Sequence, residues 1–332
     1  MERILVIGGG PAGAAAAIAA VSQGASVRVV ERSRHPRHKV CGEFLSPGVL
    51  PILESLGAGD FAGLQPARIR RCRLRFGDRE KRWNLDEPAL GLSRFELDRL
   101  LLDRALALGA VVARGESAVP GQGTGEAAAI VLAVGRQTVV SRQDRLFGFK
   151  AHFEGPQDDA VEMFFGRQGY VGVSPIENGW TNVCGIAAES ALGRHGFVVD
   201  DYVAGFHPLA ERLGPLRRRM EWLRVGPLSF SPVAGSPPND RVYAAGDALG
   251  FVDPFTGSGI LNALFTGRMA GVNAARAVAG SQHIRECRSL LHRPFGISAI
   301  FRKLIEWNCA WQLAALTPGS WLFRLTRAQF QK

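Results

Sequence analysis

The chain has 332 residues, 46% of them hydrophobic and 21% charged, which is typical of a globular protein with a large core. Its net charge of +10 favours an anionic partner, but no nucleic-acid-binding module accompanies it, so nucleic acid is not expected. No apolar run is long enough for a transmembrane helix, and five scattered cysteines exclude a disulfide framework and a cysteine-rich zinc site. We expect a cytoplasmic protein without a metal site.

The first elements predict a nucleotide-binding unit. Apolar residues 4–7 form a strand, Gly8-Gly9-Gly10-Pro11-Ala12-Gly13 a tight turn into an alanine-rich helix, and residues 27–30 a second strand ending at Glu31. The glycines let the backbone approach a pyrophosphate, and the helix N-terminus attracts its charge. Glu31 is placed to bind ribose hydroxyls and would repel a 2′-phosphate, so the sequence predicts an FAD-type or NAD-type dinucleotide.

A basic loop follows, and it leads into a short helix at residues 49–56. Residues 68–92 predict strands joined by turns at residues 77–78 and 86–88. Within them, arginines alternate with apolar residues at Arg71, Arg73 and Arg75. This pattern indicates either a solvated strand edge or a contact for an acidic carrier protein, an anionic membrane or an acidic substrate.

The next elements are a helix and two short strands. Ser93 and Glu96 form a capping box for a helix that ends at Gly109. Strands are expected at residues 111–113 and 128–134, and the glycine-rich residues 121–125 between them predict a linker rather than a second nucleotide site.

The second half changes pattern twice. Short alternating strands from about residue 147 to residue 232 predict a mainly antiparallel sheet, with a helix at residues 199–213. A strand at 242–245, the turn Gly246-Asp247-Ala248 and a helix at 259–278 then restore the α/β pattern. The apolar residues 295–323 predict a packed terminal helix or, because basic residues flank them, an interfacial membrane helix.

The predicted fold is therefore α/β, with a discontinuous Rossmann-like FAD-binding domain, an inserted, mainly antiparallel substrate sheet and a C-terminal helical segment. We assign residues 1–67, 93–146 and 235–280 to the FAD-binding domain. The substrate domain comprises residues 68–92 and 147–234, and the C-terminal helical segment residues 281–332.

Four motifs together carry a resemblance to a known family. They are the glycine turn, Lys39-Val40-Cys41-Gly42-Glu43, the helix that begins near Arg94, and Gly246-Asp247 followed by Asp253-Pro254-Phe255-Thr256-Gly257-Ser258-Gly259. In this order they resemble the FAD-dependent oxidoreductase and monooxygenase superfamily with the aromatic-hydroxylase fold, and within it the geranylgeranyl reductase branch. The resemblance implies that FAD is the cofactor. NAD(P)H use is open, because no second dinucleotide fingerprint exists.

The resemblance also implies the site residues. FAD would be held by the residues Gly8, Gly10, Pro11, Ala12, Gly13, Glu31, Arg32, Cys41, Gly42, Arg94, Gly246, Asp247, Pro254, Gly257, Ser258, Gly259 and Ile260. Cys41 is expected close to the flavin ring, either as an active-site thiol or as a small buried hydrophobe. Lys150 and His152 are additional acid–base candidates, and Phe149, Phe153, Phe165 and Tyr170 are expected to line the substrate cavity.

Where this branch carries Trp and Phe in a cavity motif, the chain has Gly172 and Ser174, which implies a cavity of different shape. The expected function is hydride transfer to or from a hydrophobic small molecule of lipid, isoprenoid or polyketide type in secondary metabolism. Two alternatives stay open at this stage: a flavin monooxygenase that uses NAD(P)H and O₂, and a non-catalytic lipid-binding protein. Association with a membrane through the C-terminal segment is a further expectation.

Overall fold

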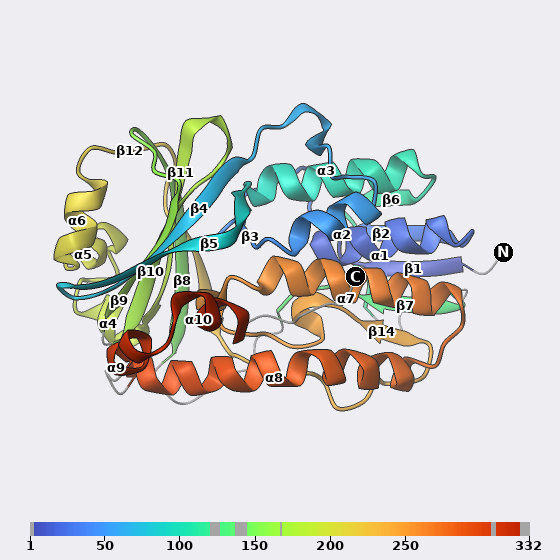
Figure 1. The fold of residues 1–332 in the computed structure, drawn as a ribbon. Coiled ribbons are helices and arrows are strands. Elements are labelled where there is room, and N and C mark those ends of the chain that lie inside the picture. The colour runs from blue at the N-terminus through green and yellow to red at the C-terminus, as the bar shows by residue number, and fades with distance from the viewer. Residues whose placement is uncertain (1–2, 120–126, 137–144, 167, 307–309, 326–332) are drawn as a thin grey trace.

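A computed structural model describes residues 3–119, 127–136, 145–166, 168–306 and 310–325. Two sheets lie side by side, and one long helix runs along both of them (Figure 1). The linker expected at residues 121–125 lies outside the described residues.

Sheet A is the nucleotide-type sheet, and all of its strand pairs are parallel. Its order is β14 (Val242–Ala244), β7 (Ala129–Leu132), β1 (Arg3–Ile7), β2 (Ser26–Glu31) and β6 (Val111–Arg114). One face is covered by α1 (Pro11–Ser22), α3 (Arg94–Ala107) and α7 (Gly259–Ala275), with α2 (Val49–Ser55) beside them. Helices α1 and α7 cross closely, and glycines at the crossing permit this. A Cβ atom at Gly267 or Gly271 would lie only 2.1 or 2.2 Å from a backbone oxygen of α1.

Sheet B has nine strands. They are β3 (Phe44–Leu45), β4 (Ala67–Phe76), β5 (Arg79–Gly91), β8 (Leu146–Glu154), β9 (Ala160–Gly166), β10 (Gly169–Pro175), β11 (Trp180–Ala188), β12 (Arg217–Arg218) and β13 (Leu223–Leu228). Strands β4 and β9 pair in parallel and the other pairs are antiparallel, so the predicted mainly antiparallel sheet is confirmed. Its outer face packs on α4 (Glu189–Gly193), α5 (Val199–Ala204) and α6 (His207–Leu213).

Three sequence predictions need correction. The turn expected at residues 86–88 is absent, because β5 continues through them and takes up the extra residues in a register shift against β4. The helix expected at residues 199–213 is two helices, α5 and α6, separated at Gly205 and Phe206. The capping box at α3 is only half formed: Ser93 Oγ accepts from the Glu96 N–H at 3.2 Å, but the Ser93 N–H donates to Glu177 instead.

The basic strand β4 is not a solvated edge. It is hydrogen-bonded on both sides, to β5 and to β9. Its arginines pair with acids: Arg71 with Asp158 and Asp159, Arg73 with Asp158, and Arg75 with Glu80, at N–O distances of 2.5 to 2.7 Å. These ion pairs occupy the charge that an acidic partner would otherwise bind.

The C-terminal segment consists of α8 (Gly280–Glu306), α9 (Ala310–Leu316) and α10 (Gly319–Leu325). Helix α8 begins before the apolar run, and its first half packs Ile284, Cys287 and Leu291 against sheet A. Lys81 of β5 donates to the carbonyl oxygens of Ala314 and Thr317, at 2.6 Å each, and so ties the end of α9 to sheet B. Within the described part of the chain, none of the helices combines the length and hydrophobicity that a membrane crossing requires.

Candidate functional site

The turn between β1 and α1 is shaped for close approach of a ligand backbone. A Cβ atom at Gly8 would lie 2.3 Å from the Ala133 oxygen, and one at Gly13 would lie 1.8 Å from the Gly8 oxygen. Neither position tolerates a side chain. At Gly10, in contrast, the nearest atom to such a Cβ is Nη2 of Arg94 at 3.6 Å, so this part of the turn is open. The free N–H groups of α1 face the same opening, as a pyrophosphate requires.

Glu31 ends β2 beside this turn, as predicted. Its carboxylate accepts hydrogen bonds from the Gly9 N–H at 2.7 Å and the Ser33 N–H at 2.9 Å. Burial alone would raise the pKa of Glu31, but these backbone donors outweigh it and hold the pKa below its ordinary value. The charged carboxylate keeps lone pairs for two ribose hydroxyls. Arg32, the next residue, is exposed.

Arg94 lies at the start of α3 and is held by a residue that the sequence reasoning missed. Its Nε and Nη2 atoms donate to the two oxygens of Asp98 at 2.8 and 3.0 Å, and Lys39 pairs with the same carboxylate at 2.7 Å. Burial opposes the charge on Arg94, but Asp98 more than compensates and raises the pKa of the guanidinium. The signal in the sequence was the spacing of four residues between Arg94 and Asp98, which brings both to one side of a helix.

The Gly246-Asp247 turn, which follows β14, and the loop at residues 253–259, which leads into α7, lie in the same region. Burial raises the pKa of Asp247, although Arg136 and Arg94 oppose the shift. Asp253 caps a short turn by accepting from the Phe255 N–H at 3.1 Å, and Gly257 has a φ angle of +64°. Helix α7 then begins at Gly259, where a Cβ atom would meet nothing within 4 Å. Ser258 and Ile260 are buried beneath this helix start.

A cavity lies between this loop, the loop at residues 40–42 and the inner face of sheet B. Cys41, Gly42, Pro254 and Gly257 form one wall of it. The opposite wall is mainly apolar and consists of Leu74, Phe76, Trp83, Met163, Phe165, Tyr170 and Ile186, with Phe301 and Ile305 of α8 at its side. Phe165 and Tyr170, which the sequence predicted to line the substrate cavity, both line this one.

Phe149 and Phe153 are not part of this cavity wall. They point to the outer face of sheet B, where both rings lie edge-on against Trp222 at centroid distances of 5.6 and 5.8 Å. The reason is the two-residue period of a strand: Lys150 and His152 of β8 face inward, so their odd-numbered neighbours face outward.

Behind Cys41 and Gly42 is a buried polar cluster, and its centre is Glu43, which the sequence reasoning did not single out. Glu43 has no exposed surface and a φ angle of +53°. Its carboxylate contacts the Lys150 ammonium and accepts a hydrogen bond from the backbone N–H of Arg94 at 2.6 Å. It also lies 2.7 Å from Nε2 of His152. Burial would raise the pKa of Glu43, but Lys150 and His152 lower it, so the carboxylate stays charged.

The same face of sheet B holds the loop at residues 39–42 through its backbone. Lys150 Nζ donates to the Lys39 oxygen at 3.3 Å, Asn182 Nδ2 to the Cys41 oxygen at 3.1 Å, and Ser174 Oγ to the Gly42 oxygen at 3.3 Å. The Cys41 wall of the cavity is thus fixed by side chains from β8, β10 and β11.

One group of side chains has the spacing of a metal site. One ligand atom each of His38, Glu43 and His152 lies within 4.8 Å of the other two. However, the Lys150 ammonium already contacts the Glu43 carboxylate and supplies the positive charge there. We therefore interpret Glu43, Lys150 and His152 as a hydrogen-bonded network, with the His38 ring packed against the ring of His152.

A parallel sheet with an open glycine turn, an acidic residue at the end of the second strand and an adjoining apolar cavity is typical of dinucleotide-dependent oxidoreductases. Residues 1–142 match the family model described as an FAD binding domain. The chain is 30% identical over 320 residues to a menaquinone reductase of Mycolicibacterium smegmatis, which covers 80% of this chain and 75% of that protein. It is 27% identical to a digeranylgeranylglycerophospholipid reductase of Methanoculleus marisnigri, covering 85% and 79%.

Solved structures show the same fold. The flavin-dependent brominase Bmp2 superposes with a TM-score of 0.81 at 18% identity, covering 98% of this chain and 93% of that one. A geranylgeranyl bacteriochlorophyll reductase-like protein of Thermoplasma acidophilum superposes with a TM-score of 0.75 at 21% identity, covering 98% and 91%. The chain belongs to the FAD-dependent oxidoreductase superfamily, in its geranylgeranyl reductase-type branch, and FAD is its cofactor.

Proposed function

We propose that this protein is a reductase that transfers a hydride from FAD to a hydrophobic, isoprenoid-type lipid. The observation that supports the proposal most is the cavity, whose wall on sheet B is built from aliphatic and aromatic side chains from Leu74 to Ile186. The names of the relatives point in the same direction, because they are reductases of menaquinone and of a digeranylgeranyl phospholipid.

In this proposal FAD, once bound, supplies hydride chemistry at its ring nitrogen N5. Gly10 and the start of α1 would hold the pyrophosphate, and Glu31 would hold the adenosine ribose. Arg94 and Asp247 would bind the ribityl portion, and the N-terminus of α7 with Gly257 would stabilise the negative charge that the ring gains on reduction. Cys41 and Gly42 would contact the ring.

The substrate would lie against β9 and β10. Phe165 and Tyr170 cover it with aromatic surface, and their rings lie 6.0 Å apart. Gly172 adds no side chain, and a Cβ atom there would be 3.1 Å from Sδ of Met163, so Met163 shapes this part of the cavity. Where the resembled branch has a bulky wall, this chain has a glycine and a flexible methionine. We propose that this difference determines which lipid fits the cavity.

The competing activity is a flavin monooxygenase or halogenase, because brominase Bmp2 shares the fold. The two reactions differ in what the product gains. Purified holoprotein, reduced without oxygen, should convert menaquinone to a product that, after air has reoxidised its quinone ring, is still heavier by two hydrogen atoms, as mass spectrometry would show. A product that forms only with O₂ and carries an added oxygen would overturn the reductase proposal. Parallel assays with NADH and NADPH would identify the electron donor, which we propose docks without a domain of its own.

A further inference from the structure

The polar cluster behind Cys41 contains a histidine that uses only one of its ring nitrogens among the described residues. His152 is buried, and its Nε2 atom is engaged with Glu43 at 2.7 Å. Its other ring nitrogen, Nδ1, is buried and has no hydrogen-bond partner among the described residues. A buried nitrogen of this kind is rare unless a proton or a water molecule is expected there in another state of the protein.

The neighbour of His152 across the sheet offers a matching acceptor. His152 and Asn182 are register partners on β8 and β11, so their side chains lie on one face about 5 Å apart at the Cβ atoms. Oδ1 of Asn182 is also buried and without a partner among the residues that the structure describes. A proton on Nδ1 of His152 would therefore have an acceptor at hand, directly or through one water molecule.

The cluster connects solvent to the cavity. On the outer side, half-buried His38 has its ring centroid 4.9 Å from that of His152, and its Nδ1 atom likewise lacks a partner within the described chain. On the inner side, Lys150 is the register partner of Cys184, whose thiol lines the cavity. Burial raises the pKa of Cys184 to about 12, so this thiol keeps its proton.

We propose that His152 takes up a second proton when the bound FAD is reduced, and that this proton leaves with the hydride. This inference rests on the proposed function. Reduction of bound FAD by two electrons from an external donor, such as a reduced nicotinamide, and one proton would add one negative charge to the site. Protonation of His152 at Nδ1 would balance that charge in a region of low dielectric. As the hydride is delivered to a substrate carbon, His152 would release its proton through Glu43 and Lys150 to Cys184, whose thiol would pass a proton to the neighbouring carbon.

The surroundings of His152 permit this change of charge. The titratable or charged groups that face it are Glu43 and His38 from the loop at residues 38–43, Lys150 from its own strand, and Cys184 from β11. Arg219 lies beyond the Trp180 ring, which separates it from the imidazole. Glu43 and Lys150 neutralise each other, so a protonated His152 would add the one net positive charge of the cluster.

The test counts protons and needs no lipid substrate. Holoprotein is reduced at an electrode at about pH 7.5, and a pH-sensitive dye measures proton uptake. The spectrum of the reduced flavin shows whether the ring itself is anionic. The wild-type protein should take up about two protons per anionic reduced FAD, and the His152→Gln variant should take up about one. The control His207→Gln, at a side chain that is 83% exposed, should take up about two, as the wild-type protein does.

Uptake of a single proton by the wild-type protein would overturn the proposal, as would an unchanged count in His152→Gln. If that variant does not retain FAD, ¹⁵N-labelled histidine in the wild-type holoprotein gives the same answer. One buried imidazole should change from neutral to doubly protonated on reduction, and the absence of any such change would refute the assignment. A protein that shows the second proton but reduces no lipid would disprove the proposed function alone.

Discussion

Two buried histidines of this protein differ in what their ring nitrogens contact. In His283, between sheet A and α8, Nε2 lies 2.9 Å from the Ala244 oxygen and Nδ1 lies 3.2 Å from Nδ2 of Asn273. Both nitrogens are therefore used by the neutral ring, with Nε2–H donating and Nδ1 accepting. In His152 one nitrogen has no partner among the residues that the structure describes, so the first histidine is suited to a structural role and the second to a change of protonation.

His283 leads to a prediction about stability and pH. Burial lowers the pKa of His283 below the ordinary value of 6.5, which the unfolded chain retains. As the pH falls below 6.5, the unfolded state binds a proton first, so the free energy of unfolding decreases between the unfolded pKa and the lower folded pKa. The urea midpoint of the wild-type protein should therefore be lower at about pH 5.5 than at about pH 7.5.

His283→Gln, which retains an amide donor for Ala244, should reduce this drop in the urea midpoint. His38, whose pKa burial also lowers, acts in the same direction and will leave part of the drop in place. The charged carboxylate of Glu43 has its pKa below 4.5 and does not titrate in this range. An identical drop in the variant would contradict the prediction.

At the scale of elements, α8 connects parts of the site that are far apart in sequence. Arg302 of α8 pairs with Asp253, and Asp253 also accepts from the Tyr170 hydroxyl at 2.6 Å. Asp253 begins the loop that we propose faces the flavin, and Tyr170 belongs to the cavity wall. One carboxylate thus joins the helix, the cofactor loop and sheet B.

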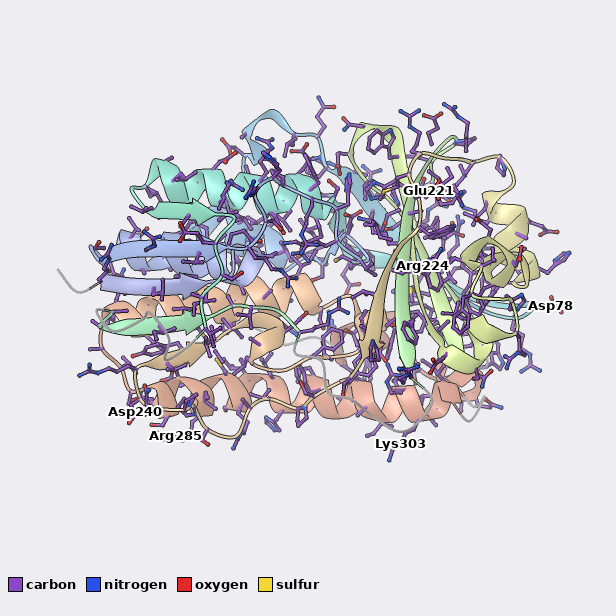
Figure 2. The ribbon with its side chains drawn as sticks, turned by 180° about the vertical axis from the view of Figure 1, so that it is seen from behind. Asp78, Glu221, Arg224, Asp240, Arg285 and Lys303 are labelled. Carbon is purple, nitrogen blue, oxygen red and sulfur yellow. The ribbon has the colours of Figure 1, made fainter. Side chains whose placement is uncertain are left out.

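Removal of Arg302 should weaken this junction. Arg302→Leu leaves the buried Asp253 with the tyrosine and the Phe255 N–H, and the loss of a hydrogen bond to a charged group costs roughly 1.5–3 kcal/mol. We expect a lower midpoint of thermal unfolding and faster dissociation of FAD. Lys303→Leu is the matched control, because Lys303 points away from α8 into solvent (Figure 2). Equal effects of the two substitutions would show that the Asp253 pair contributes nothing.

At the scale of the whole molecule, local patterns in the sequence predicted most elements but not the contacts between them. Alternation and capping residues located α3, the strands of sheet A and the longer strands of sheet B, but singled out none of β3, β12 and β13. The link between Glu43 and Lys150, 107 positions apart, has no local signal, because a lysine in an alternating strand is normally a solvent-facing residue. The same reasoning could not decide which face of β8 is the inner one, and so it misplaced Phe149 and Phe153.

The two sheets share one site, and we expect them to unfold together. The tryptophans that the structure describes are Trp83, Trp180, Trp222, Trp311 and Trp321, and all lie outside sheet A. The glycine turn that we propose binds the pyrophosphate of FAD follows β1 of sheet A. If Glu43, Lys150 and α8 couple the sheets, FAD at about 100 times its Kd should stabilise the transition seen by tryptophan fluorescence by about 2.7 kcal/mol, as it does the transition seen by circular dichroism. A tryptophan transition indifferent to FAD would mean that sheet B unfolds on its own.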